Sequence, residues 1–106
     1  MTFDISANSL CAEGGKILAE ALKDNNVMTE LNISDNELAE DEDEETDMSG
    51  VIAISDAIPT MGALTSLNLA SNNLCAKGAK IVAKAIKVNV SALRFDWYHF
   101  EILSSI

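Results

Sequence analysis

Apolar and polar positions along the chain change their spacing in a way that recurs three times. In the first half of each stretch apolar residues alternate with polar ones, as in Leu67-Asn68-Leu69, which is typical of a short strand with one buried face. In the second half the spacing lengthens, and Ile81, Val82 and Ala85 fall on one side of a helix. The pattern therefore predicts a strand, a turn and a helix in each stretch.

The three stretches are also alike residue by residue, so they form an internal repeat. The helical phrases are Gly14 to Leu22 (GGKILAEAL), Gly50 to Ile58 (GVIAISDAI) and Gly78 to Ile86 (GAKIVAKAI). Phe3, Leu31 and Leu67 occupy one shared position, at spacings of 28 and 36 residues. Because a helix makes each crossover, we expect successive strands to run parallel in an α/β fold.

The repeat organises a single domain, residues 1–106, into three units and a degenerate end. The units are residues 1–27, residues 28–63 with an acidic insert at 39–48, and residues 64–89. The pattern degrades over residues 90–106, which we interpret as a C-terminal cap. A chain of 106 residues can bury one small core.

Two of the units carry the motif of a known family. Leu64, Leu67, Leu69, Asn72 and Leu74 follow the leucine-rich-repeat spacing L-x-x-L-x-L-x-x-N-x-L, and the second unit matches it from Met28 to Leu38. Residues 2–93 resemble the ribonuclease-inhibitor-like subclass, which includes the repeats of RanGAP and NLR proteins. The resemblance implies a right-handed solenoid with parallel strands on its concave face and helices on its convex face. It implies three repeats and a degenerate fourth.

The resemblance also implies a role for the repeat asparagines. In this subclass the asparagine turns inward and satisfies backbone groups of the adjacent turn, so Asn8, Asn36 and Asn72 are expected to form a structural ladder. The family implies little about a ligand, because one fold hosts many functions.

Polar side chains are expected along the concave face of such a solenoid. The strand positions are Asp4, Ser6, Asn32, Ser34, Asn68 and Ala70, with Arg94 and Asp96 in a fourth strand. Asn32, Ser34, Asn68 and Arg94 are the candidate partner-binding residues of this face. We do not carry over the GTPase activation of RanGAP, because that chemistry needs a charged or polar residue at the nucleotide and this face is short and small.

The acidic insert (AEDEDEETDM, residues 39–48) interrupts the second unit. With Glu37 it places eight acidic residues between positions 37 and 47, which account for most of the net charge of −10. Like charges at this density repel, so we expect a mobile loop. Three interpretations stay open: a solvated insertion, a docking loop for a basic partner, and a weak calcium site without the turn Gly and terminal Glu of an EF-hand loop.

The third helix carries what we call the Lys stripe: Lys77, Lys80, Lys84 and Lys87, spaced to lie along one side. The equivalent positions of the first helix are Glu13, Lys16, Glu20 and Lys23, whose charges alternate. Either both sets are simply solvated, or the acidic insert folds over the Lys stripe of its own chain or of another copy. Such pairs are worth about 0–1 kcal/mol each and weaken with salt.

Both ends of the repeat suggest contact surfaces. Four of the five aromatic residues crowd into the last repeat and beyond: Phe95, Trp97, Tyr98 and Phe100. They are interpreted either as a cap or as an anchor for another subunit. At the other end Phe3 enters in mid-repeat, so we expect an unpaired strand edge where another chain adds. We expect a fragment of a longer solenoid or a subunit completed by neighbours.

Motifs for catalysis are absent from the sequence. His99 is the single histidine, and no Ser or Cys has an evident relation to it. There is no phosphate loop, zinc spacing or HExxH motif. We therefore expect no enzyme activity, no cofactor and no metal ion.

Charge and cysteine content narrow the partners and the compartment. The net charge of −10 argues against nucleic-acid binding. Cys11 and Cys75 lie two units apart, about 10 Å or more, which is outside disulfide range. We expect an intracellular compartment, and no membrane insertion or signal peptide, because the chain lacks a long apolar run.

The sequence predicts a non-catalytic protein–protein interaction module, an accessory or structural subunit of a larger assembly that is also capable of self-association. The alternative is a regulatory or inhibitory binder of an enzyme, acting through the concave face and the acidic insert. Neither the partner nor the pathway follows from the sequence.

Overall fold

The computed structural model describes the backbone of residues 1–89 and the side chains of residues 1–85. Its elements in chain order are β1 (Thr2–Asp4), α1 (Cys11–Leu22), β2 (Glu30–Asn32), α2 (Ser49–Ala57), the short 3-10 helix η1 (Ile58–Thr60), β3 (Ser66–Asn68) and α3 (Cys75–Asn89). The predicted alternation of strands and helices is confirmed.

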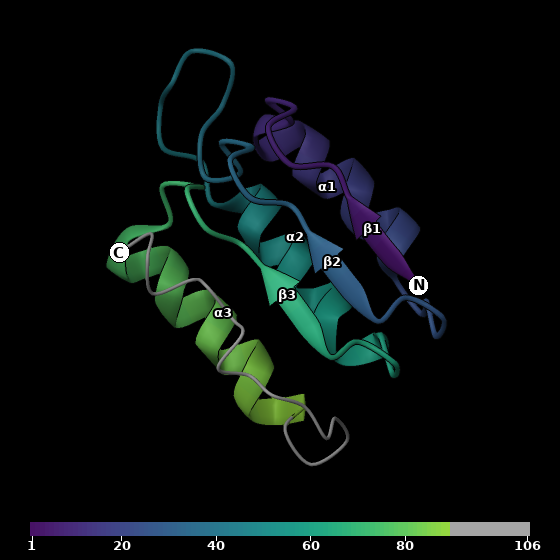
Figure 1. The fold of residues 1–106 in the computed structure, drawn as a ribbon. Coiled ribbons are helices and arrows are strands. Elements are labelled where there is room, and N and C mark those ends of the chain that lie inside the picture. The colour runs from purple at the N-terminus through teal and green to yellow at the C-terminus, as the bar shows by residue number, and fades with distance from the viewer. Residues whose placement is uncertain (90–106) are drawn as a thin grey trace.

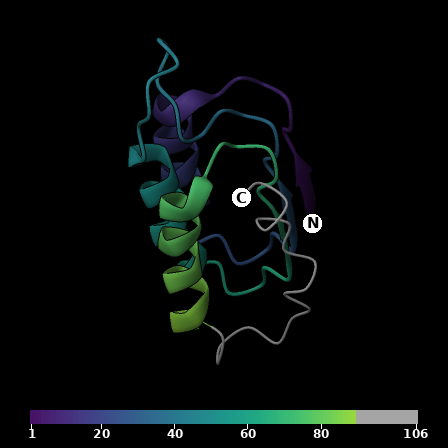
Figure 2. The same ribbon diagram turned by 90° about the vertical axis from the view of Figure 1, so that its left-hand side faces the viewer.

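The three strands form one parallel sheet in the order β1-β2-β3. Phe3 pairs with Leu31, and Leu31 pairs with Leu67, so one repeat position forms a row across the sheet. Figure 1 shows the strands side by side. Figure 2, turned by 90°, shows the helices stacked on one side of the sheet. The described residues therefore form an α/β structure of two layers, as predicted for the fold class.

The core lies between these layers and is filled by the second and third units. Its largest fully buried side chains include Leu31, Ile33, Leu38, Ile54, Leu67, Leu69, Leu74 and Val82. Full burial of one such side chain is worth about 1.5–3 kcal/mol relative to exposure. The alternation of the strands and the helical spacing thus bring the repeat leucines and isoleucines to one interior, which also receives Met61 and Leu64 from the segment before β3.

Helices α1 and α2 approach closely at two glycines. A β-carbon on Gly50 would lie 2.7 Å from the Ala12 carbonyl oxygen and 2.8 Å from the Ala12 Cα. A β-carbon on Gly15 would lie 3.2 Å from the Gly50 Cα. These are backbone atoms that cannot move aside, so glycine at position 50 sets how closely the first two units pack.

The turns between strands and helices use the same left-handed backbone positions in each unit. The φ angle is positive at Ala7, Asp35 and Ser71, and again two residues later at Ser9, Glu37 and Asn73. A left-handed residue with a side chain costs about 1–2 kcal/mol. Contacts elsewhere must therefore hold these turns in place.

Asn72 provides such contacts between the third and second units. Its side chain is fully buried, and its Oδ1 accepts hydrogen bonds from the backbone N–H groups of Asn36 (2.8 Å) and Leu38 (3.3 Å). Its Nδ2 donates to the carbonyls of Ile33 (3.0 Å) and Leu69 (2.9 Å). One amide thus links the turns of two neighbouring units.

Asn36 repeats this arrangement one unit earlier. Its Oδ1 accepts from the backbone N–H of Asn8 (2.8 Å), and its Nδ2 donates to the carbonyls of Ile5 (3.1 Å) and Ile33 (3.1 Å). Asn36 is also fully buried, whereas Asn8 is exposed. The first asparagine therefore differs from the two that follow it.

Removing the Asn72 amide tests this link. Asn72→Ala leaves buried backbone groups of the second and third units without partners, so we expect a loss of about 3 kcal/mol in the free energy of unfolding. Asn8→Ala, a matched change at an exposed position, should cost less than about 1 kcal/mol. Urea denaturation measures both, and equal losses would contradict the assigned role of Asn72.

Candidate functional site

The strand side of the first unit leaves apolar residues partly uncovered. Phe3, Ile5 and Leu10 are only half-buried. The equivalent side chains of the later units are at most 2% exposed: Leu31, Ile33 and Leu38 in the second unit, and Leu67, Leu69 and Leu74 in the third. The first row faces no other unit on its outer side among the described residues.

The helix of the first unit continues the same uncovered surface. Aligned on Gly14, Gly50 and Gly78, the Leu18 position corresponds to Ile54 and Val82, which are 1% and 0% exposed. Leu18 itself is half-buried, and its neighbour Ile17 is 67% exposed. We call this surface the first-unit end face; its residues are Phe3, Ile5, Leu10, Ile17, Leu18 and Ala21.

The outer edge of β1 and the side-chain oxygen of Asn8 have no partner among the described residues. β1 pairs only with β2, so its outer edge faces no strand in the described part of the chain. In the later units Oδ1 of Asn36 and Asn72 accepts backbone hydrogen bonds from the unit before. No donor within residues 1–89 reaches Oδ1 of Asn8, whose Nδ2 donates to the Ile5 carbonyl (2.7 Å). The predicted unpaired edge is therefore present among the described residues.

A row of polar side chains lies at the ends of the three strands. Oδ1 of Asp4 accepts from the N–H and the hydroxyl of Ser6 (2.9 and 2.7 Å), and Oδ1 of Asn32 does the same with Ser34 (3.0 and 2.7 Å). Asn68 accepts from the N–H of the residue two positions on, at 2.9 Å. These bonds start the turn that ends each strand.

Two members of this row, Asp4 and Asn32, also contact each other. Asn32 donates to Oδ2 of Asp4 at 3.4 Å. The Ser6 backbone N–H, with smaller contributions from the Ser6 hydroxyl and Asn32, lowers the pKa of Asp4 below its usual value. Asp4, Asn32 and Asn68 thus form a fixed polar row on the strand ends, and Ser34 joins it half-buried.

The acidic insert forms a compact turn with hydrogen bonds of its own, and its expected mobility stays a prediction. Glu40 and Thr46 form an antiparallel bridge. Oδ1 of Asp41 accepts from the backbone N–H groups of Asp43 (2.8 Å) and Glu45 (2.9 Å). A side chain that bonds the backbone ahead of it creates a local turn despite the repulsion of neighbouring charges. Charge density alone could not reveal this bond.

The base of the acidic insert is tied to its neighbours. The Glu40 carbonyl accepts from the Ala12 N–H at 2.8 Å, and the Glu40 carboxylate accepts from the Asn73 side chain. Figures 1 and 2 show the insert projecting past the ends of the helices. One of the open interpretations placed the insert over the Lys stripe of its own chain, but no ion pair joins the two among the described side chains.

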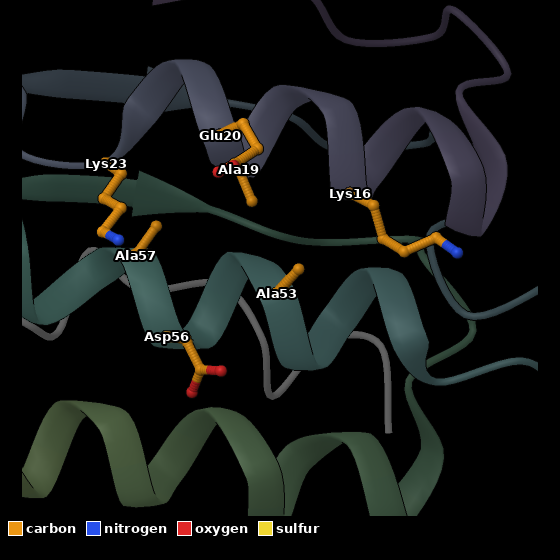
Figure 3. A pocket seen from close by; sticks show the side chains of 7 residues that line it. All are labelled: Lys16, Ala19, Glu20, Lys23, Ala53, Asp56 and Ala57. Carbon is orange, nitrogen blue, oxygen red and sulfur yellow. The ribbon is translucent and has the colours of Figure 1, made fainter.

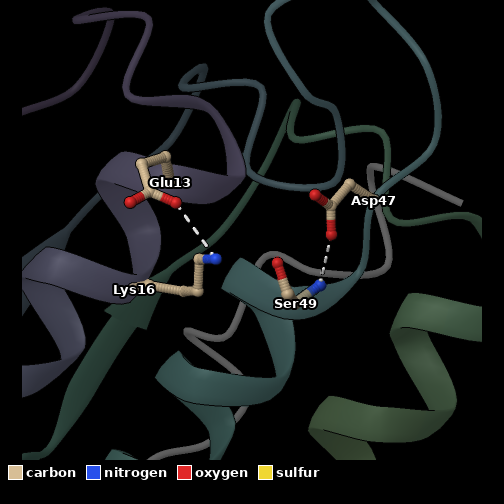
Figure 4. Close-up of polar contacts among 4 residues, drawn as sticks. All are labelled: Glu13, Lys16, Asp47 and Ser49. Carbon is tan, nitrogen blue, oxygen red and sulfur yellow. Dashed lines mark hydrogen bonds and ion pairs between the residues drawn. The ribbon is translucent and has the colours of Figure 1, made fainter.

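Figure 4 shows two polar contacts near the insert, one between the insert and the start of α2 and one within the first turns of α1. The Ser49 N–H donates to Oδ1 of Asp47 at 2.9 Å, and Lys16 forms an ion pair with Glu13 at 3.0 Å. Ser49, whose backbone N–H donates to the carboxylate, and the positive charge of Lys16 lower the pKa of Asp47. Asp47 therefore holds a negative charge close to the start of α2.

A shallow groove of about 360 Å³ runs between α1 and α2 (Figure 3). Its floor is made of Ala19, Ala53 and Ala57, and charged side chains such as Lys16 and Asp56 stand around it. The small alanines reflect the close approach of the two helices. Nothing buried and polar points into the groove, so it offers no evident catalytic group.

Cys11 lies beside the acidic insert, while Cys75 is exposed, and both thiols are free. Burial, followed by the negative charge of Glu37 and of insert residues such as Glu42, raises the pKa of Cys11. A raised pKa leaves less of the nucleophilic thiolate at neutral pH. No group of three or more potential metal ligands occurs among the described residues.

Several predicted site residues lie outside the described part of the chain. These are Arg94, Phe95, Asp96, Trp97, Tyr98, His99 and Phe100, together with the side chain of Lys87. The expected fourth strand and C-terminal cap are outside it as well. Lys77, Lys80 and Lys84, the described part of the Lys stripe, are all exposed on α3.

The helix part of the first-unit end face was not singled out from the sequence. The signal was present, because the repeat alignment places Leu18 at a position where the later units have Ile54 and Val82. Whether that position is covered depends on which units stand next to it. The exposure of Ile17 and Leu18 therefore depends on the three-dimensional arrangement of the units and cannot be read from the repeat alone.

Acidification tests the assigned contact of Asp47. Its lowered pKa means that the ionised group stabilises the fold above the ordinary aspartate pKa of about 3.9, and that this contribution is lost as pH falls through the folded-state pKa. Between about pH 5 and pH 2, wild type should therefore lose more free energy of unfolding than Asp47→Asn. Asp43→Asn, at the exposed insert tip, is the control. Identical pH profiles for wild type and Asp47→Asn would contradict the contact.

Comparisons of this chain with protein-family models, with curated proteins and with solved structures gave no match. Among the described residues, no helix combines the length and the apolar character needed to cross a membrane.

Proposed function

We propose that this chain is a non-catalytic protein–protein interaction module, built as a leucine-rich-repeat solenoid, that serves as an accessory or structural subunit of a larger assembly. Support for the solenoid comes from the parallel row of Phe3, Leu31 and Leu67, from the recurring left-handed turn positions, and from the asparagine contacts between units. In this arrangement the strands line the concave face and the helices the convex face.

The observation that carries the proposal is the contrast in burial between equivalent positions. Ile17 is 67% exposed and Leu18 is half-buried, whereas Ile54, at the Leu18 position of the second unit, is 1% exposed. Exposed apolar surface of this kind, bordered by an open strand edge, marks a place where protein surface is buried on association. The first-unit end face is therefore the proposed contact surface.

The occupant that fits this face is a further strand–turn–helix unit from another protein chain. The first unit already shows how such a unit binds, because its N–H groups at Ile5 and Ala7 donate to the carbonyls of Asn32 and Ser34, each at 3.0 Å. Its helix meets the second unit through small buried residues, among them Gly15. A partner unit with the same donors and a small-residue helix face would continue the sheet and cover the end face.

Substitution of Ile17 tests the end face. The isolated chain should self-associate, and this association should persist at high salt because burial of apolar surface drives it. Ile17→Lys should lower the association constant about tenfold, since it places a charge in the contact. Ile52→Lys is a matched control on α2, where Ile52 is 45% exposed and outside the end face.

Light scattering coupled to size exclusion measures both variants. A wild-type chain that stays monomeric at every concentration, or equal effects of the two substitutions, would contradict the end face as a contact surface.

A second candidate function is a regulatory or inhibitory binder that uses the concave face and the acidic insert. The fixed row of Asp4, Asn32 and Asn68 favours it, because side chains held by the backbone lose little conformational freedom on binding. Such a binder would be a soluble monomer that does not self-associate. The accessory-subunit function needs no contact at this row.

Substitution on the concave face separates the two candidates. Asn32→Ala combined with Asn68→Ala should leave self-association at high salt unchanged if the end face is the contact surface. Circular dichroism checks that the double variant is folded, since both side chains also bond the backbone. A drop in association as large as that of Ile17→Lys would move the contact to the concave face.

A further inference from the structure

The Lys stripe occupies positions that stay exposed when helices pack side by side. Lys80 and Lys84 correspond to Lys16 and Glu20 of α1, and those two residues remain exposed although α2 packs against α1. Lys77, Lys80 and Lys84 themselves are exposed. Neither neighbouring units nor an extended solenoid would therefore cover this surface.

The positive charges of the Lys stripe are not neutralised within the described structure. Lys16 and Glu13 form the ion pair found in residues 1–85, and no described lysine of the stripe takes part in one. The acidic side chain facing the stripe from the neighbouring helix is Asp56, which points from α2 toward α3 in Figure 3 and borders a shallow groove with Lys84. One carboxylate beside three lysines leaves the surface positive.

The acidic insert presents the opposite charge in a preformed shape. Its tip residues Glu42, Asp43, Glu44 and Glu45 are all exposed, and none of them forms an ion pair with a described lysine. The bridge from Glu40 to Thr46 and the Asp41 hydrogen bonds already order the backbone of the turn. Binding would therefore require little additional ordering of the insert backbone.

We propose that two copies of this chain form a salt-sensitive pair in which the acidic insert of each copy binds the Lys stripe of the other. Charge complementarity identifies the occupant: a basic helix face and an acidic turn lie on the same molecule, and neither forms an ion pair among the described side chains. A two-fold axis makes both contacts at once and closes the pair. This contact is separate from the first-unit end face and does not depend on it.

The strong net charge does not oppose this pairing as much as it first suggests. Eight of the 17 acidic residues lie between positions 37 and 47, and the rest of the chain is nearly balanced. Repulsion between two copies therefore arises mainly between the two inserts. When each insert binds a Lys stripe, its negative charges are paired with positive ones. Salt at physiological strength screens the remaining repulsion beyond about 8 Å.

Charge reversal with complementation tests the proposal. The first variant, Lys80→Glu with Lys84→Glu, reverses the Lys stripe, and the second, Glu42→Lys with Asp43→Lys, reverses the insert tip. Each alone should lower the self-association constant at low salt about tenfold. An equimolar mixture of the two variants should form mixed pairs, because one reversed stripe then meets one reversed insert.

A third variant controls for net charge. Lys16→Glu with Lys23→Glu changes the total charge by the same amount as the stripe variant, but on α1 and the residue that follows it. It should keep the low-salt association of the wild type. Sedimentation velocity on the complete 106-residue chain at low and high salt measures all the species.

Three results would overturn the proposal. These are a wild-type chain whose association does not fall with salt, a control variant as impaired as the stripe variant, and a mixture that fails to restore pairing. Lower wild-type stability in high salt without any change of oligomeric state would assign the contact to a single chain instead. The end face is tested separately, because its association persists at high salt and depends on Ile17.

Discussion

The buried asparagine amide is the interaction on which the rest of the structure depends. Each unit ends its strand in a turn with left-handed residues, which are unfavourable for side chains other than glycine. Asn36 and Asn72 satisfy the backbone of these turns and bond the turn of the unit before. Local turn geometry and the packing of neighbouring units are therefore set by the same side chain. The parallel register and the stacked helices follow from it.

The same constraint explains why the first unit leaves apolar residues partly exposed. A unit is complete only when another unit supplies N–H donors to its asparagine and apolar cover to its core residues. Asn8 is exposed and Phe3 and Leu18 are half-buried because no described unit does so. Lys80 on α3 and Glu42 at the insert tip, by contrast, are exposed and make no contribution to the core. The proposed apolar and charged contacts would thus lie on different surfaces of the molecule.

Much of the fold could be predicted from the sequence, because its signals are local and repeated. Alternating apolar and polar residues at Leu67-Asn68-Leu69 predicted β3, and the helical spacing of apolar residues around Val82 predicted α3. Because a helix connects successive strands, the strands were expected to be parallel, as they are. The turn within the acidic insert could not be predicted from its charge. It depends on a single side chain, Asp41, which bonds the backbone ahead of it. The exposure of Ile17 likewise depends on neighbours that no local pattern specifies.

Hydrogen exchange of individual backbone amides would test the central role of the asparagine link most directly. The N–H groups of Asn36 and Leu38, which donate to Oδ1 of Asn72, should exchange only through global unfolding. The N–H groups of Asp43 and Glu45, bound within the exposed insert, should exchange much faster. If the N–H groups of Asn36 and Leu38 exchanged as fast as those of the insert, the asparagine hydrogen bonds would not hold the units together. Apolar packing alone would then have to do so.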